Sequence, residues 1–91
     1  MYNRSQRERL IEQLKKNTDL RMEVPDYVVE AASPEDEENY RLLAGHWRYL
    51  MQKKRSAGEE EKKELSKQLF DVEQYMKIAQ FGDRNIERFI N

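Results

Sequence analysis

The sequence predicts an all-α protein: an antiparallel hairpin of two long helices, with a shorter N-terminal helix packed on it and a short C-terminal helix. Apolar side chains recur at alternating steps of three and four between Tyr40 and Leu50, and again between Leu65 and Ala79. The short connection Ser56-Ala57-Gly58 lies between the two predicted helices. We therefore expect the two helices to be antiparallel neighbours that bury each other along a coiled-coil-like seam.

Composition favours one thin helical domain spanning residues 1–91. Charged residues make up 38% of the chain and apolar residues 37%, which suits amphipathic helices with large solvated faces. A chain of 91 residues is near the lower size limit for a single core, so a partner or a second copy would help its stability. No apolar run approaches the roughly 18 residues of a membrane span, and we expect a cytoplasmic protein.

The first helix is predicted at about residues 4–17. Ser5 and Glu8 have the spacing of a capping box, which would start it. Its apolar stripe consists only of Leu10, Ile11 and Leu14. Because short isolated helices are marginal in water, this helix must dock on the hairpin or on another surface.

Residues 18–32 are predicted to form an extended linker that includes a short helix. Leu20, Met22 and Val24 alternate with charged residues, which is the period of an extended segment with one buried side. No second strand-like run exists to pair with it, so a linker laid along the helices is favoured over a sheet. Pro25 can begin a short helix, and an irregular loop is the alternative.

The two long helices are predicted at about residues 34–55 and 59–81. Ser33 caps the first, Pro34 occupies its first turn, and its charges run from acidic at the start to basic at the end. Ser56 and Glu59 offer a second capping box, and Gly58 can close one helix or open the next. Gly82 then stops the chain before a last short helix at about residues 84–90.

No constellation of catalytic or metal-ligating residues is present in the sequence. His46 has no carboxylate and no second histidine three or four positions away, and the chain has no cysteine. The three glycines are scattered, which excludes a phosphate-binding loop, and the acidic runs lack the spacing of a calcium loop. We therefore expect no enzyme activity, no cofactor, no metal and no small-molecule substrate.

Gly45 lies inside the first long helix, where glycine costs about 0.5 to 1 kcal/mol relative to alanine. The simplest compensation is the close approach of another helix of the same chain. The alternative is that part of a binding partner approaches at this position.

The second long helix carries a further set of apolar side chains outside its seam: Phe70, Ile78 and Phe81, with Tyr75 beside them. The first and last short helices could cover it, or it could be exposed for dimerisation or target binding. The favoured function is therefore a protein-interaction module, such as a small adaptor, inhibitor or regulator, and a phage or mobile-element origin would suit it. The expected anchors are large aromatic side chains: Trp47, Tyr49, Phe70, Tyr75 and Phe81.

The alternative function is a nucleic-acid-binding regulator. Its basic residues would come from the N-terminal and central blocks: Arg4, Arg7, Arg9, Lys15, Lys16, Arg41, Arg48, Lys53, Lys54 and Arg55. A net charge of −1 and the lack of a helix-turn-helix pair count against it. A third hypothesis is structural self-assembly through the seam. The sequence leaves open whether the strongly acidic residues 19–39 neutralise the basic block within the chain.

Overall fold

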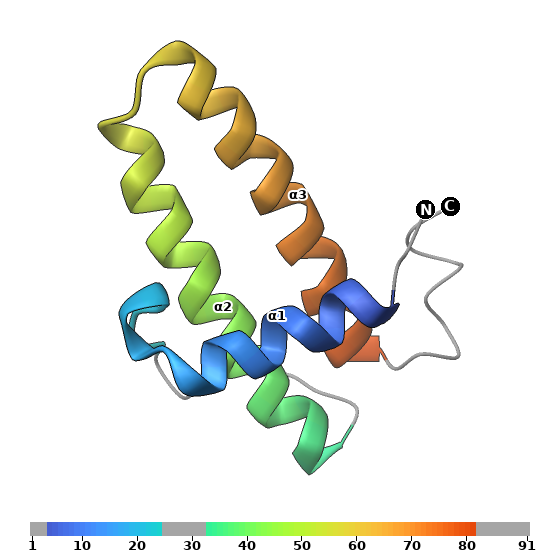
Figure 1. The fold of residues 1–91 in the computed structure, drawn as a ribbon. Coiled ribbons are helices and arrows are strands. Elements are labelled where there is room, and N and C mark those ends of the chain that lie inside the picture. The colour runs from blue at the N-terminus through green and yellow to red at the C-terminus, as the bar shows by residue number, and fades with distance from the viewer. Residues whose placement is uncertain (1–3, 25–32, 82–91) are drawn as a thin grey trace.

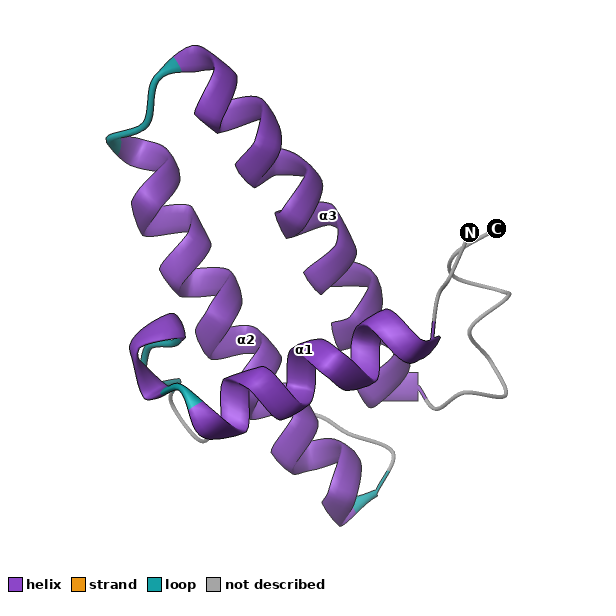
Figure 2. Ribbon diagram, in the orientation of Figure 1, coloured by secondary structure: helices purple, strands orange, loops and turns teal. Residues whose placement is uncertain are grey.

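Helices account for most of the computed structural model, which describes residues 4–24 and 33–81. They are α1 (Arg4–Lys16), the short 3-10 helix η1 (Thr18–Leu20), α2 (Pro34–Arg55) and α3 (Glu59–Phe81). No strand occurs in these two ranges (Figure 2). The all-α prediction is confirmed, whereas the predicted helices near Pro25 and at residues 84–90 lie outside the described residues.

The hairpin of α2 and α3 has the predicted bounds and the predicted antiparallel arrangement (Figure 1). Ser33 caps α2, since its hydroxyl accepts a hydrogen bond of 3.1 Å from the Asp36 backbone N–H. At the turn, the carbonyl of Gly58 accepts from Lys62, so this glycine opens α3. The second capping box is wrong, because the Ser56 hydroxyl turns back and donates to the Lys53 carbonyl at the end of α2.

The core of the protein is the predicted seam. Both helices contribute completely or almost completely buried side chains to it: Leu43 and Leu50 from α2, with Leu65, Leu69, Val72 and Ala79 from α3. Tyr40, Trp47 and Met76 were also expected in the seam but are only half-buried. They therefore lie at its edge, where their side chains reach the surface.

Helix α1 crosses the hairpin over the N-terminal half of α2 and near the end of α3 (Figure 1). Ile11 and Leu14 are buried in the same core as Tyr75 and Ile78 of α3. The predicted docking of α1 is thus confirmed, and part of the extra apolar set on α3 is covered within the chain. Because α1 begins at Arg4, Ser5 lies inside the helix and does not cap it as predicted.

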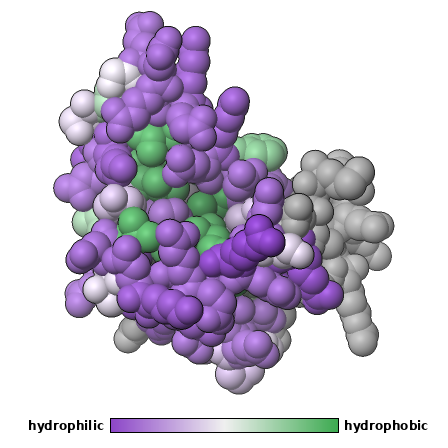
Figure 3. Space-filling model, viewed as in Figure 1, coloured by the Kyte–Doolittle hydropathy of each residue, from purple (hydrophilic) through white to green (hydrophobic). Residues whose placement is uncertain are grey.

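On the face seen in Figure 3, hydrophobic side chains gather between α2 and α3 and hydrophilic ones surround them. This distribution agrees with an apolar seam between the two helices. In residues 4–24 and 33–81, no helix combines the length and the apolar character needed to cross a membrane.

Residues 18–24 form a strap that lies on α2. Asn17 caps the 3-10 turn at its start, and the chain is extended at Arg21, with φ −146° and ψ 157°. The sequence predicted the extended part but not the 3-10 turn. The prediction of a segment laid along the helices is confirmed for residues 18–24, and residues 25–32 lie outside the described residues.

At Gly45 the backbone of the strap packs closely against the backbone of α2. The backbone N–H of Met22 donates a hydrogen bond of 3.0 Å to the Gly45 carbonyl. A Cβ at position 45 would collide with the Met22 carbonyl oxygen and would lie 3.3 Å from the Arg21 Cβ. The predicted close approach is confirmed, although it comes from the extended strap and not from another helix.

Candidate functional site

The strap is held to α2 at three points, which fixes the position of Met22. Three hydrogen bonds join the two segments: Met22 N–H to the Gly45 carbonyl, the His46 ring to the Leu20 carbonyl at 2.7 Å, and Arg48 to the Glu23 carbonyl at 2.8 Å. Together they hold residues 20–23 of the strap against residues 45–48 of α2. The strap therefore has one defined register on α2.

Trp47 is the aromatic side chain that links α2 to α3 on the surface. Its indole Nε1 donates a hydrogen bond of 3.0 Å to the Glu73 carboxylate on α3. The ring is half-buried, and a hydrogen bond to a carboxylate is of the stronger, charge-assisted kind. Trp47 is therefore held in one orientation while part of its ring stays accessible.

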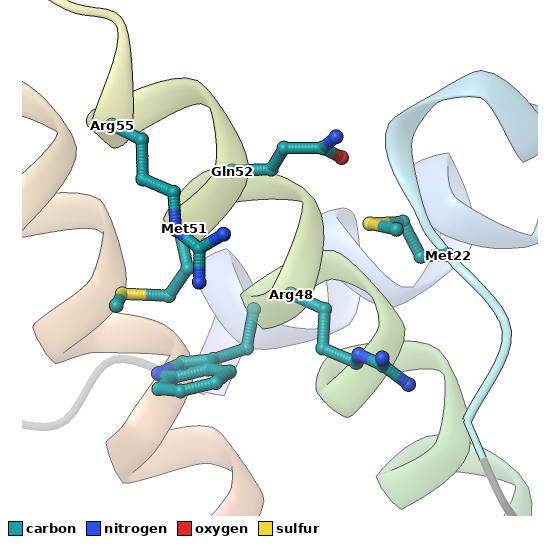
Figure 4. A pocket seen from close by; sticks show the side chains of 6 residues that line it. Met22, Arg48, Met51, Gln52 and Arg55 are labelled. Carbon is teal, nitrogen blue, oxygen red and sulfur yellow. The ribbon is translucent and has the colours of Figure 1, made fainter.

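One side of Trp47 faces a cavity of about 270 Å³, which we call the Trp47 pocket. It lies between the strap and one face of α2, and its lining residues are Met22, Trp47, Arg48, Met51, Gln52 and Arg55 (Figure 4). Two methionines and an indole give it a soft apolar surface. Two arginines place positive charge at its edge.

The two arginines of the Trp47 pocket differ in their contacts. Arg48 points toward the strap and donates one hydrogen bond to the Glu23 carbonyl. Arg55 extends back along α2 beside Met51, and no hydrogen bond or ion pair joins it to another of the described residues (Figure 4). Within those residues neither guanidinium is neutralised by a carboxylate.

A second hollow, of about 340 Å³, also includes Trp47 in its lining. It lies between α2 and α3, and its lining residues are Tyr40, Trp47, Glu73, Met76, Lys77 and Gln80. Its charges are mixed, because Glu73 and Lys77 have opposite signs. Trp47 thus borders two hollows of different character.

The other predicted anchors do not lie together. Tyr49 stacks on His46 with ring centroids 6.0 Å apart and has the Lys53 ammonium 5.5 Å from its ring centre. Tyr75 is only 7% exposed and packs in the core, whereas Phe70 is 60% exposed on α3. The side chain of Phe81 lies outside the described residues. A binding role for these four aromatics stays a prediction.

The predicted basic patch is divided in the structure. Arg4 lies 3.8 Å from Glu8, and Arg7 is only 8% exposed, so α1 does not present three free arginines side by side. Arg9 is exposed on α1, Lys53 and Lys54 are at the end of α2, and Arg48 and Arg55 border the Trp47 pocket. The Trp47 pocket therefore combines accessible positive charge with an apolar surface.

His46 makes a structural contact with the strap. It is buried, and its Nδ1–H donates to the Leu20 carbonyl. Among the described residues, no group of three or more histidine, cysteine, aspartate or glutamate side chains is close enough to hold a metal ion.

Acid should weaken the fold through His46. Burial lowers its pKa below the usual value of 6.5, the Leu20 hydrogen bond raises it, and the positive charge of Lys53 lowers it. The unfolded chain therefore binds the proton more readily, so the contribution of neutral His46 is complete above about pH 6.5 and falls as the pH drops below it.

Urea unfolding at about pH 7.5 and about pH 5.5 tests this prediction, since His46 is the one histidine of the chain. The unmodified protein should lose more stability on acidification than His46→Gln, whose amide can still donate to Leu20. An identical pH dependence of the two proteins would show that His46 does not contribute.

The sequence nominated Trp47, Arg48 and Arg55 but missed Met22, Met51 and Gln52. Met51 and Gln52 lie one helical turn from Trp47 and Arg48, and this spacing indicates that they share a helix face with them. Met22 reaches the pocket only because the strap folds onto α2, and only the unexplained Gly45 pointed to that contact.

Comparisons with protein-family models, curated proteins and solved structures find no match for this chain. The candidate site is therefore defined by the geometry of the chain itself.

Proposed function

We propose that this chain is a non-enzymatic protein-interaction module that binds a partner protein through Trp47 and the hollows beside it. The observation that carries the proposal is the state of Trp47: half-buried, fixed by Glu73, and part of the lining of two hollows. Tryptophan is enriched among the residues that dominate binding energy at protein interfaces. A ring fixed before binding loses little conformational entropy when a partner covers it.

The size of the hollows supports a protein partner. Cavities of about 270 and 340 Å³ lie near or below the lower limit of about 300 Å³ for small-molecule sites. Each has room for one or two side chains of a partner. The partner can be a different protein or a second copy of this chain, and sedimentation at rising concentration distinguishes the two.

The nucleic-acid alternative has less support. Arg7 is buried, and α1 crosses α2 far from the Lys53–Arg55 end, so the two basic blocks do not form one continuous surface. A phosphate backbone needs several accessible cations along its path.

Affinity capture tests the proposal, with the chain as bait in a lysate of its source organism. We expect Trp47→Ala to reduce the recovery of the partner about tenfold or more, as loss of an anchor does. The control variant Lys63→Ala changes an exposed side chain near the N-terminus of α3. It should recover the partner as well as the unmodified chain does. The proposal fails if nothing is enriched, or if a folded Trp47→Ala chain captures the same protein equally well.

A further inference from the structure

Positive charge is concentrated in the part of α2 that forms the Trp47 pocket. Residues 40–55 contain no acidic side chain and five basic ones: Arg41, Arg48, Lys53, Lys54 and Arg55. Among the residues that the structure describes, no carboxylate lines the pocket, and both of its arginines are exposed. A ligand that enters the pocket therefore meets unneutralised positive charge and would gain from carrying negative charge.

The spacing of the pocket residues matches a helical ligand. Arg48, Gln52 and Arg55 occupy positions i, i+4 and i+7 of α2, so they share one face. The rise of 1.5 Å per residue places the two arginine backbone positions about 10 Å apart along the axis. Acidic residues separated by two turns of a second helix lie at a comparable distance on one face.

The apolar floor of the pocket suits a helix as well. Met22 and Met51 come from different segments, and flexible methionines adapt their shape to an inserted apolar side chain. Amphipathic helices commonly dock in such grooves through apolar anchor residues that are spaced by three, four and seven positions along the helix.

From this charge and geometry we infer that the Trp47 pocket binds an acidic amphipathic helix of the partner protein. An apolar side chain of that helix enters between Met22, Met51 and Trp47, and its carboxylates face Arg48 and Arg55. The inference rests on the proposed function and specifies the chemistry of the partner.

Three synthetic helical peptides of about 20 residues test it. All three share the same leucine stripe and lack tryptophan. At the positions that flank the stripe, one peptide carries glutamate, one glutamine and one lysine. The fluorescence of Trp47 is a direct readout of the site, because it is the one tryptophan of the chain. We expect the glutamate peptide to shift the emission and to bind about fivefold or more tighter than the glutamine peptide, and tighter still than the lysine peptide.

Substitution of the pocket arginines provides the matched comparison. The double variant Arg48→Gln, Arg55→Gln should remove the preference for glutamate while a folded Trp47 pocket still reports weak binding of the apolar stripe. The control Lys63→Gln, Lys67→Gln removes two exposed lysines from α3, lowers the net charge equally, and should keep the preference.

Four outcomes would overturn the inference. Equal affinity for the glutamate and glutamine peptides would refute an acidic partner but leave binding at Trp47 intact. A preference for glutamate that survives loss of both arginines would show that Arg48 and Arg55 do not recognise the carboxylates. A response of Trp47 to a single-stranded or duplex oligonucleotide, without one to the glutamate peptide, would identify a nucleic acid as the anionic ligand. No response to any peptide would also reject it, while the capture experiment tests the proposed function separately.

Discussion

Replacing Leu69 by alanine should lower the free energy of unfolding by about 2 to 5 kcal/mol, the cost of truncating a leucine in a packed core. Leu69 is 4% exposed and belongs to the cluster that joins all three α-helices. A domain of this size has a total stability of about 5 to 15 kcal/mol, so the variant should lose a large part of it. Val72→Ala should act in the same direction but less strongly, because valine loses fewer atoms.

Urea unfolding followed by circular dichroism measures this loss as a lower midpoint. Phe70→Ala is the matched control, since the neighbouring side chain is 60% exposed and its truncation should cost less than about 1 kcal/mol. Unchanged midpoints for Leu69→Ala and Val72→Ala, or an equal loss for Phe70→Ala, would contradict the assignment of the seam.

The long helices could be predicted to the residue because their signals are local. Ser33 and Pro34 fix the start of α2, and the acidic-to-basic order of charges agrees with its direction. The stripes at steps of three and four identify the buried side of each helix without knowledge of any other element. The whole hairpin can therefore be derived from its own sequence.

The position of α1 could not be derived in the same way. Its short stripe predicts that it docks, but the sequence does not say on which face of the hairpin it lands. As a result, Tyr75 was grouped with exposed anchors although the structure buries it in the same core as Leu14 of α1. Phe70, five residues earlier on the same helix, points in another direction and stays exposed.

Only half of the residues that line the Trp47 pocket could be predicted from the sequence. Trp47, Arg48 and Arg55 stand out by residue type on one helix. Met22 joins them only through hydrogen bonds between segments more than 20 residues apart, such as that from His46 to Leu20. No local pattern specifies such a register, because it depends on the match of two backbones in space.

Gly45→Ala should test that match, with an expected loss of about 1 to 3 kcal/mol, as overpacking against a rigid neighbour does. In an unconstrained helix the same change would stabilise the protein by about 0.5 to 1 kcal/mol, so the sign of the effect is informative. The added methyl group meets the backbone carbonyl of Met22, which cannot rotate away as a side chain would. The strap must move, and the hydrogen bond from Met22 to Gly45 lengthens or breaks.

Gly58→Ala is the matched control, because a Cβ at that position meets no atom within 4 Å. It should leave the free energy of unfolding unchanged or slightly raised, since alanine restricts the unfolded chain. Displacement of the strap also withdraws Met22 from the Trp47 pocket, so Gly45→Ala should alter the emission of Trp47 while Gly58→Ala should not. If Gly45→Ala instead stabilised the protein as Gly58→Ala is expected to, the strap would not be seated on α2, and the pocket that it completes would have to be abandoned.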